Sequence, residues 1–335
     1  MGDKLVTLFG GSGFIGRYAA RSLVQAGYRV RVAVRRPHLA GDVRLAGAPG
    51  WVDIVQANVR HKASVEAAIE GADAVVNLVG ILYEKGRQSF EGAQREGAKN
   101  IAEACAAANV ETLVHVSAIG ADPDSRADYA KTKAEAEQAV RSAVPSAVIL
   151  RPSIVFGPED QFFNRFAAMS SHPISTFAPF LPAIGGGDTK LQPVYAGDVA
   201  DAIANAVSRS DAAGKTYELG GPRVYSFNDL YDYIGKTIDR KRYALPLPFF
   251  IAKPLGLTFG AVFRYVWPLS SGIFGAPPIT GDQVEMLKTD NVVSDKALTL
   301  ADLGVEHVES VEAIVPSYLY RFRPYGQYHQ ESESA

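Results

Sequence analysis

The sequence has very little cysteine, which excludes one large class of folds at once. Cys105 is the single cysteine among 335 residues, so no disulfide can form within the chain. It lies in an alanine-rich helical stretch, residues 101–108, which predicts a small buried side chain rather than a reactive thiol. Sparse cysteine is typical of proteins from reducing compartments. We therefore expect a cytoplasmic or equivalent location.

The sequence also lacks long apolar runs, basic blocks and paired histidines. No uninterrupted apolar run reaches 18 residues, so no transmembrane helix is predicted, and the first strand begins too early to leave room for a cleavable signal. The net charge is −2 without a block rich in Lys and Arg, so nucleic acid is not an expected partner. The six histidines show no close pairing, so no metal site is expected.

What the sequence has is a regular alternation of strands and helices in its first half. The predicted strands are Leu5–Phe9, Val30–Val34, Val52–Gln56, Ala74–Val79, Leu113–Ser117 and Ala147–Leu150. The predicted helices are Phe14–Ala26, Ala63–Glu70, Gln88–Ala108 and Tyr129–Ser142. Strands that are apolar on both faces and joined by helices indicate a parallel sheet covered on both sides. The fold class is therefore α/β, a doubly wound sheet of the Rossmann type.

The pattern changes after Arg151-Pro152, where prolines and glycines multiply and the alternation stops. We predict a nucleotide-binding domain over 1–151, a smaller mixed lobe over 152–326 and a flexible tail over 327–335. Within the smaller lobe, helices are predicted at Asp198–Ser208, Phe227–Ile238 and Glu309–Arg321. This lobe is expected to pack at the carboxyl edge of the sheet, where folds of this class hold their ligands.

A glycine-rich loop links the first predicted strand directly to the first predicted helix. It reads Gly10-Gly11-Ser12-Gly13-Phe14-Ile15-Gly16. Gly10 can make the tight turn, Gly13 lets the backbone approach a pyrophosphate, and Gly16 allows close packing of helix on strand. Free backbone N–H groups at the helix start would then face the phosphates. The loop predicts a bound dinucleotide.

Basic residues near this loop indicate which dinucleotide is bound. A fold that prefers NAD usually places Asp or Glu at the end of the second strand, but here Arg35-Arg36 stands there and Arg17 follows the loop. Guanidinium groups can bind a 2′-phosphate through paired, charge-assisted hydrogen bonds. The alternative is that these arginines are ordinary solvated surface charges. We expect NADPH, with NADH less favoured.

Further cofactor contacts are expected wherever a strand of the sheet ends. Asn58 and Val59 follow the third strand and are expected near the adenine. Leu78, Val79 and Gly80 end the fourth strand, where a small residue lets the cofactor pass. The remaining predicted contacts, after the fifth and sixth strands, are Ser117, Tyr129, Lys133, Pro152 and Ile154. These assignments rest on position along the chain.

Three of these residues form a candidate reductase centre. Tyr129 and Lys133 make a Tyr-x-x-x-Lys pair, which shares one face of a helix, and Ser117 ends the preceding strand. A neighbouring ammonium and a cationic nicotinamide would lower the phenol pKa towards neutrality. Tyr129 could then exchange a proton with a carbonyl or alcohol that Ser117 polarises. The alternative is a retained cofactor-binding trio without turnover.

Together these residues resemble the extended and atypical short-chain dehydrogenase/reductases. The run over residues 151–167, with its Phe-Gly-x-Glu-Asp-x-Phe-x-Asn-x-Phe-Ala pattern, is similar to the dinucleotide-binding accessory subunit of respiratory complex I and its bacterial relatives. Residues 192–195 with Asp198-Val199, and residues 280–285, resemble further motifs of the same family. The resemblance extends from Leu5 to about Tyr320, nearly the whole chain.

This resemblance implies a tightly held NADPH that takes no part in electron transfer. The family's subunit stabilises the junction between the peripheral and membrane arms near the quinone site, and related proteins are associated with ubiquinone biosynthesis. Only about a dozen residues separate Ser117 from Tyr129, about half the number usual in active members of the extended class. We therefore favour an accessory or assembly protein of complex I. A working NADPH-dependent reductase, epimerase or dehydratase is the second hypothesis, and a redox-state sensor is the third.

One apolar segment, residues 243–278, is rich in aromatic and aliphatic side chains. Prolines and two basic residues interrupt it, so it cannot span a bilayer as one helix. A surface on lipid or on a membrane-embedded partner fits this composition. The alternative is that the segment forms the apolar underside of the smaller lobe. The first interpretation predicts a protein peripheral to the cytoplasmic face of a bacterial inner membrane, or to the matrix face in mitochondria.

Overall fold

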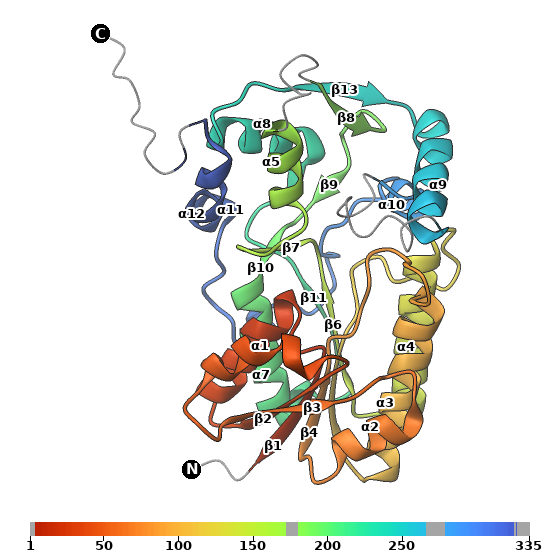
Figure 1. The fold of residues 1–335 in the computed structure, drawn as a ribbon, viewed down its shortest axis with the longest axis vertical. Helices are drawn as coiled ribbons and strands as arrows, with labels where there is room; N and C mark the ends of the chain where they lie inside the picture. The colour runs from red at the N-terminus through yellow and green to blue at the C-terminus, as the bar shows by residue number, and fades with distance from the viewer. Residues whose placement is uncertain (1–3, 172–179, 266–278, 325, 327–335) are drawn as a thin grey trace.

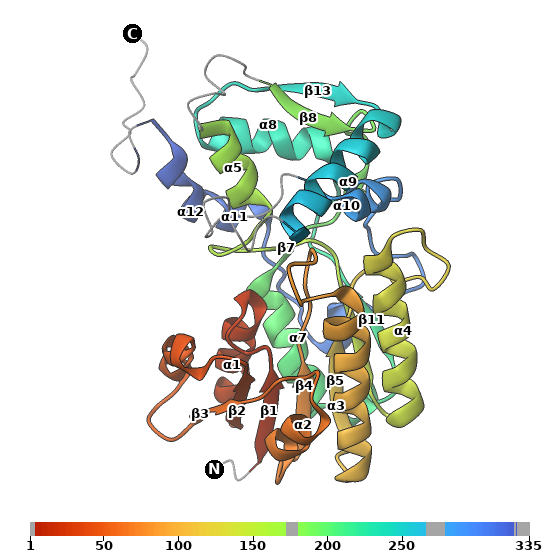
Figure 2. The ribbon, with the colours of Figure 1, turned by 45° about the vertical axis from the view of Figure 1, so that its right-hand side comes forward.

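The computed structural model describes residues 4–171, 180–265, 279–324 and 326, drawn in colour in Figure 1. A sheet flanked by helices forms one lobe, and a lobe of small sheets and short helices lies over one end of it (Figures 1 and 2). The predicted tail, 327–335, and the end of the predicted apolar segment, 266–278, lie outside the described residues.

Seven strands form the central sheet, in the order β11-β6-β5-β4-β1-β2-β3 and parallel throughout. Their bounds are β1 Leu5–Phe9, β2 Arg29–Val34, β3 Val52–Gln56, β4 Ala74–Asn77, β5 Thr112–Val116, β6 Val148–Pro152 and β11 Thr216–Leu219. Leu8 of β1 lies in register with Val32 on one side and Val76 on the other, and all three are fully buried. Apolar residues on both faces of each strand favour this parallel arrangement, which confirms the predicted fold class.

Helices cover both faces of the sheet (Figure 2). One face packs against α1 Phe14–Gln25 and α7 Ala196–Ser208. The other packs against α2 Lys62–Ile69, α3 Glu96–Ala107 and α4 Asp128–Ala143, and its core includes the fully buried Cys105. Burial raises the pKa of that thiol to about 12, so it stays protonated and inert.

The central sheet and its covering helices include residues from well beyond position 151. Helix α7 packs beside α1, and β11 pairs with β6 as the edge strand. Both elements lie in residues 196–219, within the stretch that the sequence assigned to the smaller lobe. The predicted domain division at residue 151 stays a prediction, but the sheet itself does not end there.

In the described residues, the second lobe contains three two-stranded sheets and several helices, most of them short. Its strands are β7 Val155–Phe156 with β10 Val194–Tyr195, β8 Phe180–Ile184 with β13 Tyr243–Leu247, and β9 Lys190–Leu191 with β12 Tyr225–Ser226. Its helices are α5 Phe163–Ser171, α8 Phe227–Thr237, α9 Phe249–Tyr265, α10 Gly281–Met286, α11 Val311–Ile314 and α12 Pro316–Leu319. Short 3-10 turns elsewhere in the chain are Pro37–Leu39, Gly41–Ala46, Ser210–Ala212, Ala301–Leu303 and Tyr320–Phe322.

The run that carries the family resemblance, residues 151–167, has a structural role in this lobe. Phe162 contacts Phe163, Phe166 and Phe227 edge to face, with ring centroids 5.0–5.6 Å apart. The buried Asp160 carboxylate accepts the backbone N–H of Phe162 at 2.9 Å, which sets the start of α5. The run therefore identifies a lobe core rather than a reactive site.

Two predicted helices differ from the structure. Glu309–Arg321 is not one helix but two short ones and a 3-10 turn, because Pro316 has no N–H with which to continue the first. The helix predicted at Gln88–Ala108 begins later, with a π-helical turn at Glu91–Arg95, because Gln88 pairs with Lys85 in a tight turn. Among the helices of the described ranges, none combines the length and apolar content needed to cross a bilayer.

Candidate functional site

The predicted site residues gather at the carboxyl edge of the sheet. Strand β1 lies between β2 and β4 in the sheet. The chain therefore adds β2 and β3 on one side of β1 and then crosses to add β4, β5 and β6 on its other side. At such a switch point the loops after neighbouring strands diverge, and this edge holds the ligands of doubly wound folds. The predicted residues lie at or just after the carboxyl ends of β1 to β6, or in the first two turns of α1 and α4.

The glycine loop has the geometry that a pyrophosphate cradle requires. Gly10 has φ +82°, a left-handed conformation that favours glycine. A Cβ on Gly16 would lie 2.4 Å from the Gly10 carbonyl oxygen, so no larger residue fits without moving the loop. Helix α1 begins at Phe14 with Gly13 as its N-cap and no side-chain cap. The first-turn amides are therefore available to an anion.

The loop lies against the end of β4, which completes this part of the edge. A Cβ on Gly10 would be 3.2 Å from the carbonyl carbon of Leu78, so the backbones after β1 and β4 are close neighbours. The Val79 N–H donates to the buried Asn77 side chain at 3.0 Å. Gly80 is exposed, and a Cβ there would lie 3.4 Å from the Lys133 Nζ. These contacts place the end of β4 between the glycine loop and Lys133.

The arginines at the ends of β2 and β3 form a basic cluster. Arg35 and Arg36 are exposed, and the pKa of the Arg35 guanidinium is lowered by partial burial, by Arg60 and by Arg36. With its amide oxygen turned towards Arg35, Gln88 accepts from both of its terminal nitrogens at 3.1 and 3.2 Å. Arg60 donates to the backbone oxygen of Arg87 at 2.9 Å. Arg60 and Gln88 are absent from the sequence prediction, although Arg60 comes only two residues after Asn58.

Three other predicted cofactor contacts already have partners within the protein. Arg17 donates to the Ser12 carbonyl at 3.1 Å and pairs with Asp42 at 3.5 Å. The Asn58 side chain accepts the Arg60 backbone N–H at 3.2 Å. The Val59 side chain is buried against Gly97, where a Cβ would lie only 2.8 Å from the Val59 Cγ2. Their predicted contacts with the cofactor stay predictions.

The three residues of the candidate trio lie at the end of β5 and in the first two turns of α4. Ser117 directly follows β5, and its buried Oγ has no hydrogen-bond partner within the described part of the chain. Tyr129 lies in the first turn of α4, with its ring edge-on to Phe90 at 5.8 Å between centroids. Lys133, one turn later, donates to the Val116 carbonyl at 3.0 Å. Lys133 thus contacts the backbone next to Ser117, and a polar ligand would satisfy the unpaired Ser117 hydroxyl.

Comparison with known proteins identifies the family. Residues 6–220 match the NAD dependent epimerase/dehydratase family. The chain belongs to that family. Its resemblance to complex I subunits is also confirmed. The 40 kDa subunit of mitochondrial NADH-ubiquinone oxidoreductase from Neurospora crassa is 30% identical, over 98% of this chain and 82% of that protein. Subunit 9 of the mitochondrial NADH dehydrogenase (ubiquinone) 1 alpha subcomplex from Arabidopsis thaliana is 37% identical, over 90% and 74%.

A solved structure supports the fold of this epimerase/dehydratase family member. The NADPH-dependent quinone oxidoreductase QOR2 from Escherichia coli, solved with NADPH, superimposes with a TM-score of 0.71. The match covers 94% of this chain and 99% of that one, at 19% sequence identity. At this identity the likeness shows the fold alone. The cradle at Gly10 and Gly16 and the unpaired Ser117 hydroxyl fit the family's dinucleotide.

The electrostatics of the trio differ from the sequence prediction. Burial raises the pKa of Tyr129 to about 12, whereas the sequence argument expected a lowered phenol pKa. Burial lowers the pKa of Lys133 to about 8, against the opposing influence of Glu137. Desolvation disfavours the charged form of each group, the phenolate of Tyr129 and the ammonium of Lys133. In the protein by itself Tyr129 is therefore a neutral phenol.

A buried histidine beside the trio was not predicted. His115 is in β5, its Nδ1 lies 3.1 Å from the Asn77 side-chain nitrogen, and burial together with Lys133 lowers its pKa to about 3. The Nε2 of His115 has no partner among the described residues. Its position in the apolar pattern of β5 is the signal that marks it as buried.

This histidine gives the family member a defined pH dependence. Its folded pKa of about 3 lies below the usual value of 6.5, so between these values the unfolded chain binds more protons. The stability that His115 contributes is therefore complete above pH 6.5 and is lost as the pH falls. From pH 7 to pH 5 the free energy of unfolding should drop by about 2 kcal/mol more than in His115→Gln, measured by urea denaturation. The exposed His38→Gln variant should keep the wild-type slope, and equal slopes for wild type and His115→Gln would contradict the assignment.

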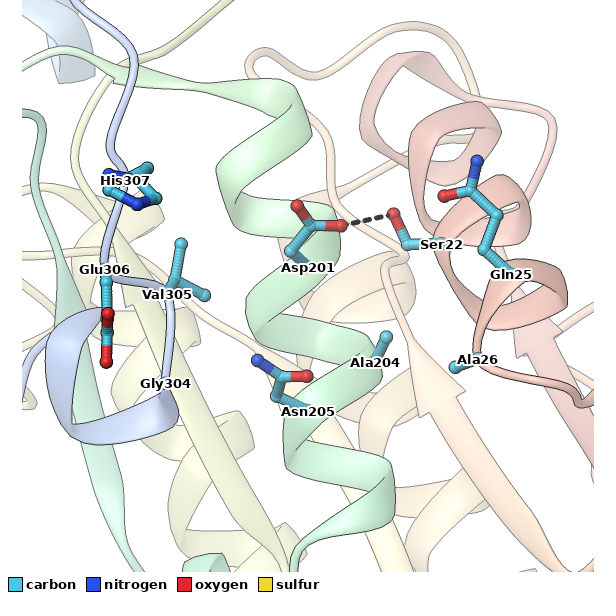
Figure 3. A pocket seen from close by; sticks show the side chains of 10 residues that line it. All are labelled: Ser22, Gln25, Ala26, Asp201, Ala204, Asn205, Gly304, Val305, Glu306 and His307. Carbon is cyan, nitrogen blue, oxygen red and sulfur yellow. Dashed lines mark hydrogen bonds between the residues drawn. The ribbon is translucent and has the colours of Figure 1, made fainter.

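A surface hollow of about 340 Å³ lies elsewhere, between α1 and α7 (Figure 3). Ser22 and Asp201 are joined across it by a 2.8 Å hydrogen bond. Its lining includes Gln25, the last residue of α1, so it lies at the opposite end of that helix from the glycine loop. It is separate from the dinucleotide edge. No group of three or more potential metal ligands occurs within the described ranges.

Proposed function

We propose that this chain is an NADPH-binding accessory or assembly protein of respiratory complex I, in which the dinucleotide is a structural ligand. The observation that carries the proposal is the similarity to complex I subunits over nearly the whole chain, including the second lobe. Similarity that extends over both lobes favours a shared role in assembly, because a shared nucleotide fold alone would account only for the first lobe. The partners proposed are complex I subunits near the quinone site, at the junction of the two arms.

The packing around Tyr129 supports a ligand that is held rather than turned over. The phenol is neutral, Phe90 lies against its ring, and a short connection of about a dozen residues joins it to Ser117. A substrate pocket needs residues that form its walls, and this short connection provides few of them. A ligand that binds only the folded state still stabilises it, by about 2.7 kcal/mol at a hundredfold excess over Kd. That is sufficient reason for a cofactor site without turnover.

The basic cluster supports NADPH over NADH. The positions after β2 hold Arg35 and Arg36 where an acidic residue would select NADH, and Arg60 adds a third charge from the end of β3. None of these three forms an ion pair with any residue that the structure describes. A 2′-phosphate supplies the negative charge and the acceptor oxygens that such a cluster lacks.

An apolar face on α9 supports a place at the membrane surface. Phe250, Leu257 and Val262 are 77%, 58% and 50% exposed. Between Arg240 and Thr280 the sequence has five basic residues and no acidic one. Apolar side chains flanked by positive charge suit the surface of an anionic bilayer. We propose a peripheral position on the cytoplasmic face of a bacterial inner membrane, or on the matrix face in mitochondria.

The second candidate function is an NADPH-dependent reductase or epimerase that acts on a carbonyl compound or quinone precursor. The observation that favours it is the unpaired, buried Ser117 hydroxyl at the end of β5, next to the Val116 carbonyl that Lys133 binds. In such an enzyme Tyr129 would hold or release the proton, with Lys133 beside it and Ser117 binding the substrate oxygen. The bound nicotinamide would supply the hydride chemistry.

Native purification from the cells that make the protein tests the proposal. We expect the full chain to sediment with membranes, to migrate with complex I after mild solubilisation, and to carry NADPH. Phe250→Asp combined with Leu257→Asp should move it to the soluble fraction, because both changes place charge on the exposed face of α9. Leu39→Asp with Leu45→Asp, on exposed residues of the other lobe, is the matched control and should not.

The enzyme hypothesis makes the opposite prediction for the same preparation. A free-standing protein whose NADPH is oxidised by a quinone or carbonyl acceptor would contradict the accessory role. The contradiction would be complete if Tyr129→Phe abolished that turnover while NADPH stayed bound.

A further inference from the structure

Helix α4, which carries Tyr129, has no cap of its own. Its N-cap is Ala127, which has no side-chain acceptor, so the N–H groups of Asp128 and Tyr129 find no partner within the helix. A helix start of this kind is stabilised by a carboxylate, which accepts these N–H groups and complements the helix dipole. Asp128 does place a carboxylate in the first turn, but α4 has no cap hydrogen bond from the side chain at its N-cap position.

The missing cap comes from the other lobe. The Asp282 carboxylate accepts the Asp128 N–H through Oδ1 at 3.3 Å and the Tyr129 N–H through Oδ2 at 3.2 Å. Asp282 lies in α10, more than 150 residues away along the chain, and α10 lies beside the start of α4 in Figure 1. Burial and the nearby charges of Asp128 and Glu84 raise the pKa of Asp282, while the two amides lower it. The bonds to α4 therefore offset part of the cost of burying this charge.

The carboxylate is itself held by a rigid support. Thr280 is the N-cap of α10 and exchanges hydrogen bonds with Gln283 in a reciprocal cap. The backbones of α9 and α10 touch, because a Cβ on Gly256 would lie only 2.8 Å from the carbonyl carbon of Thr280. These contacts place Asp282 without any contribution from α4.

We propose that Asp282 is a positioning residue for Tyr129. It acts by capping α4 from the second lobe. This inference rests on the proposed role of the Tyr129 site and does not depend on which dinucleotide is bound. The start of α4 is then held at Asp282 of the second lobe, through its first turn, and at the Lys133–Val116 hydrogen bond to the sheet, through its second turn. Loss of Asp282 releases the turn that holds Tyr129 and leaves the second anchor in place.

The test uses the full chain without added dinucleotide, with 3-fluorotyrosine placed at position 129. In Asp282→Ala we expect the fluorine resonance of Tyr129 to shift or broaden. Amide exchange over residues 128–131 should become about 10-fold faster, while exchange in α3 is unchanged. Asp282→Asn, which keeps the shape and one acceptor, should restore part of both effects. Glu285→Gln is the matched control on the same helix, since its carboxylate faces Lys253 and Lys288, and it should leave the resonance in place.

An unchanged fluorine resonance and unchanged exchange in Asp282→Ala would overturn the inference. If Asp282→Ala does not fold, Asp282→Asn provides the test. Its side chain can accept only one of the two amide N–H groups, so a wild-type fluorine resonance in this variant would also overturn the inference. Failure of the proposed function is a separate result. It would show as absence of NADPH or of complex I from the native preparation, and neither enters this measurement.

Discussion

Replacing Arg35 by aspartate is expected to weaken NADPH binding about 100-fold and to leave NADH binding nearly unchanged. Hydrogen bonds to charged groups contribute roughly 1.5–3 kcal/mol, which corresponds to a factor of about 10 to 100 in Kd, and the new carboxylate adds repulsion. NADH has no 2′-phosphate, so it does not experience either effect. Titration of both dinucleotides by calorimetry at one fixed ionic strength measures the difference.

The control for this experiment is Arg29→Asp. Arg29 is exposed and begins the same strand, β2, so the charge change is identical but lies at the opposite edge of the sheet. It should leave both affinities near those of the wild type. Equal losses of NADPH and NADH in Arg35→Asp would show that Arg35 does not bind the phosphate. The cluster would then be an ordinary solvated surface.

Replacing Gly16 by alanine is expected to have the second large effect, on stability and on both dinucleotides. The new Cβ would lie 2.4 Å from the Gly10 oxygen and 2.6 Å from the Gly11 Cα, both backbone atoms that no rotamer change can move. The loop must shift away from α1, at a cost of about 2–3 kcal/mol in the free energy of unfolding. Because the cradle is then distorted, NADPH and NADH should both lose about 100-fold in affinity.

Gly41→Ala is the matched control for this change. A Cβ on Gly41 meets nothing within 4 Å, and its backbone is not in the left-handed region. Thermal unfolding and dinucleotide titration of the two variants should therefore differ sharply. A Gly16→Ala protein with wild-type melting temperature and wild-type affinity would show that the loop tolerates a side chain, and the cradle assignment would be wrong.

The elements that the sequence predicted well are those whose signals are local. The strands from Leu5–Phe9 to Val52–Gln56 and the glycine loop depend on residues within a few positions of each other, and the structure has them at the expected places. The edge of the sheet at which the site lies also followed from the pattern, because parallel strands joined by helices leave their carboxyl ends on one side. The broken helix after Glu309 was missed although Pro316 was visible, because apolar spacing there outweighed one proline in the prediction.

The contacts that join distant segments could not be predicted. Nothing near Arg35 in the sequence indicates Arg60 or Gln88, and nothing near Ala127 indicates Asp282, although residues 280–285 were noted as a family motif. The pKa of Tyr129 was expected in the wrong direction, because spacing shows which charges are near but not how completely a group is removed from water. The return of residues 216–219 to the sheet was missed for a related reason, since one short strand has no local feature that assigns it to a distant edge.

By itself, then, the sequence determined that this chain is a doubly wound α/β protein with a phosphate loop, a basic strand end and a Ser-Tyr-Lys trio. These features depend on periodicity, backbone freedom and charge at adjacent positions. Only the tertiary structure decided that Ser117 and Lys133 are buried and that Tyr129 is a neutral phenol, that the basic cluster draws on three loops, and that the second lobe caps the helix of Tyr129. Burial and long-range hydrogen bonds exist only once segments that are distant in the sequence are packed together, so they leave no local trace in the sequence.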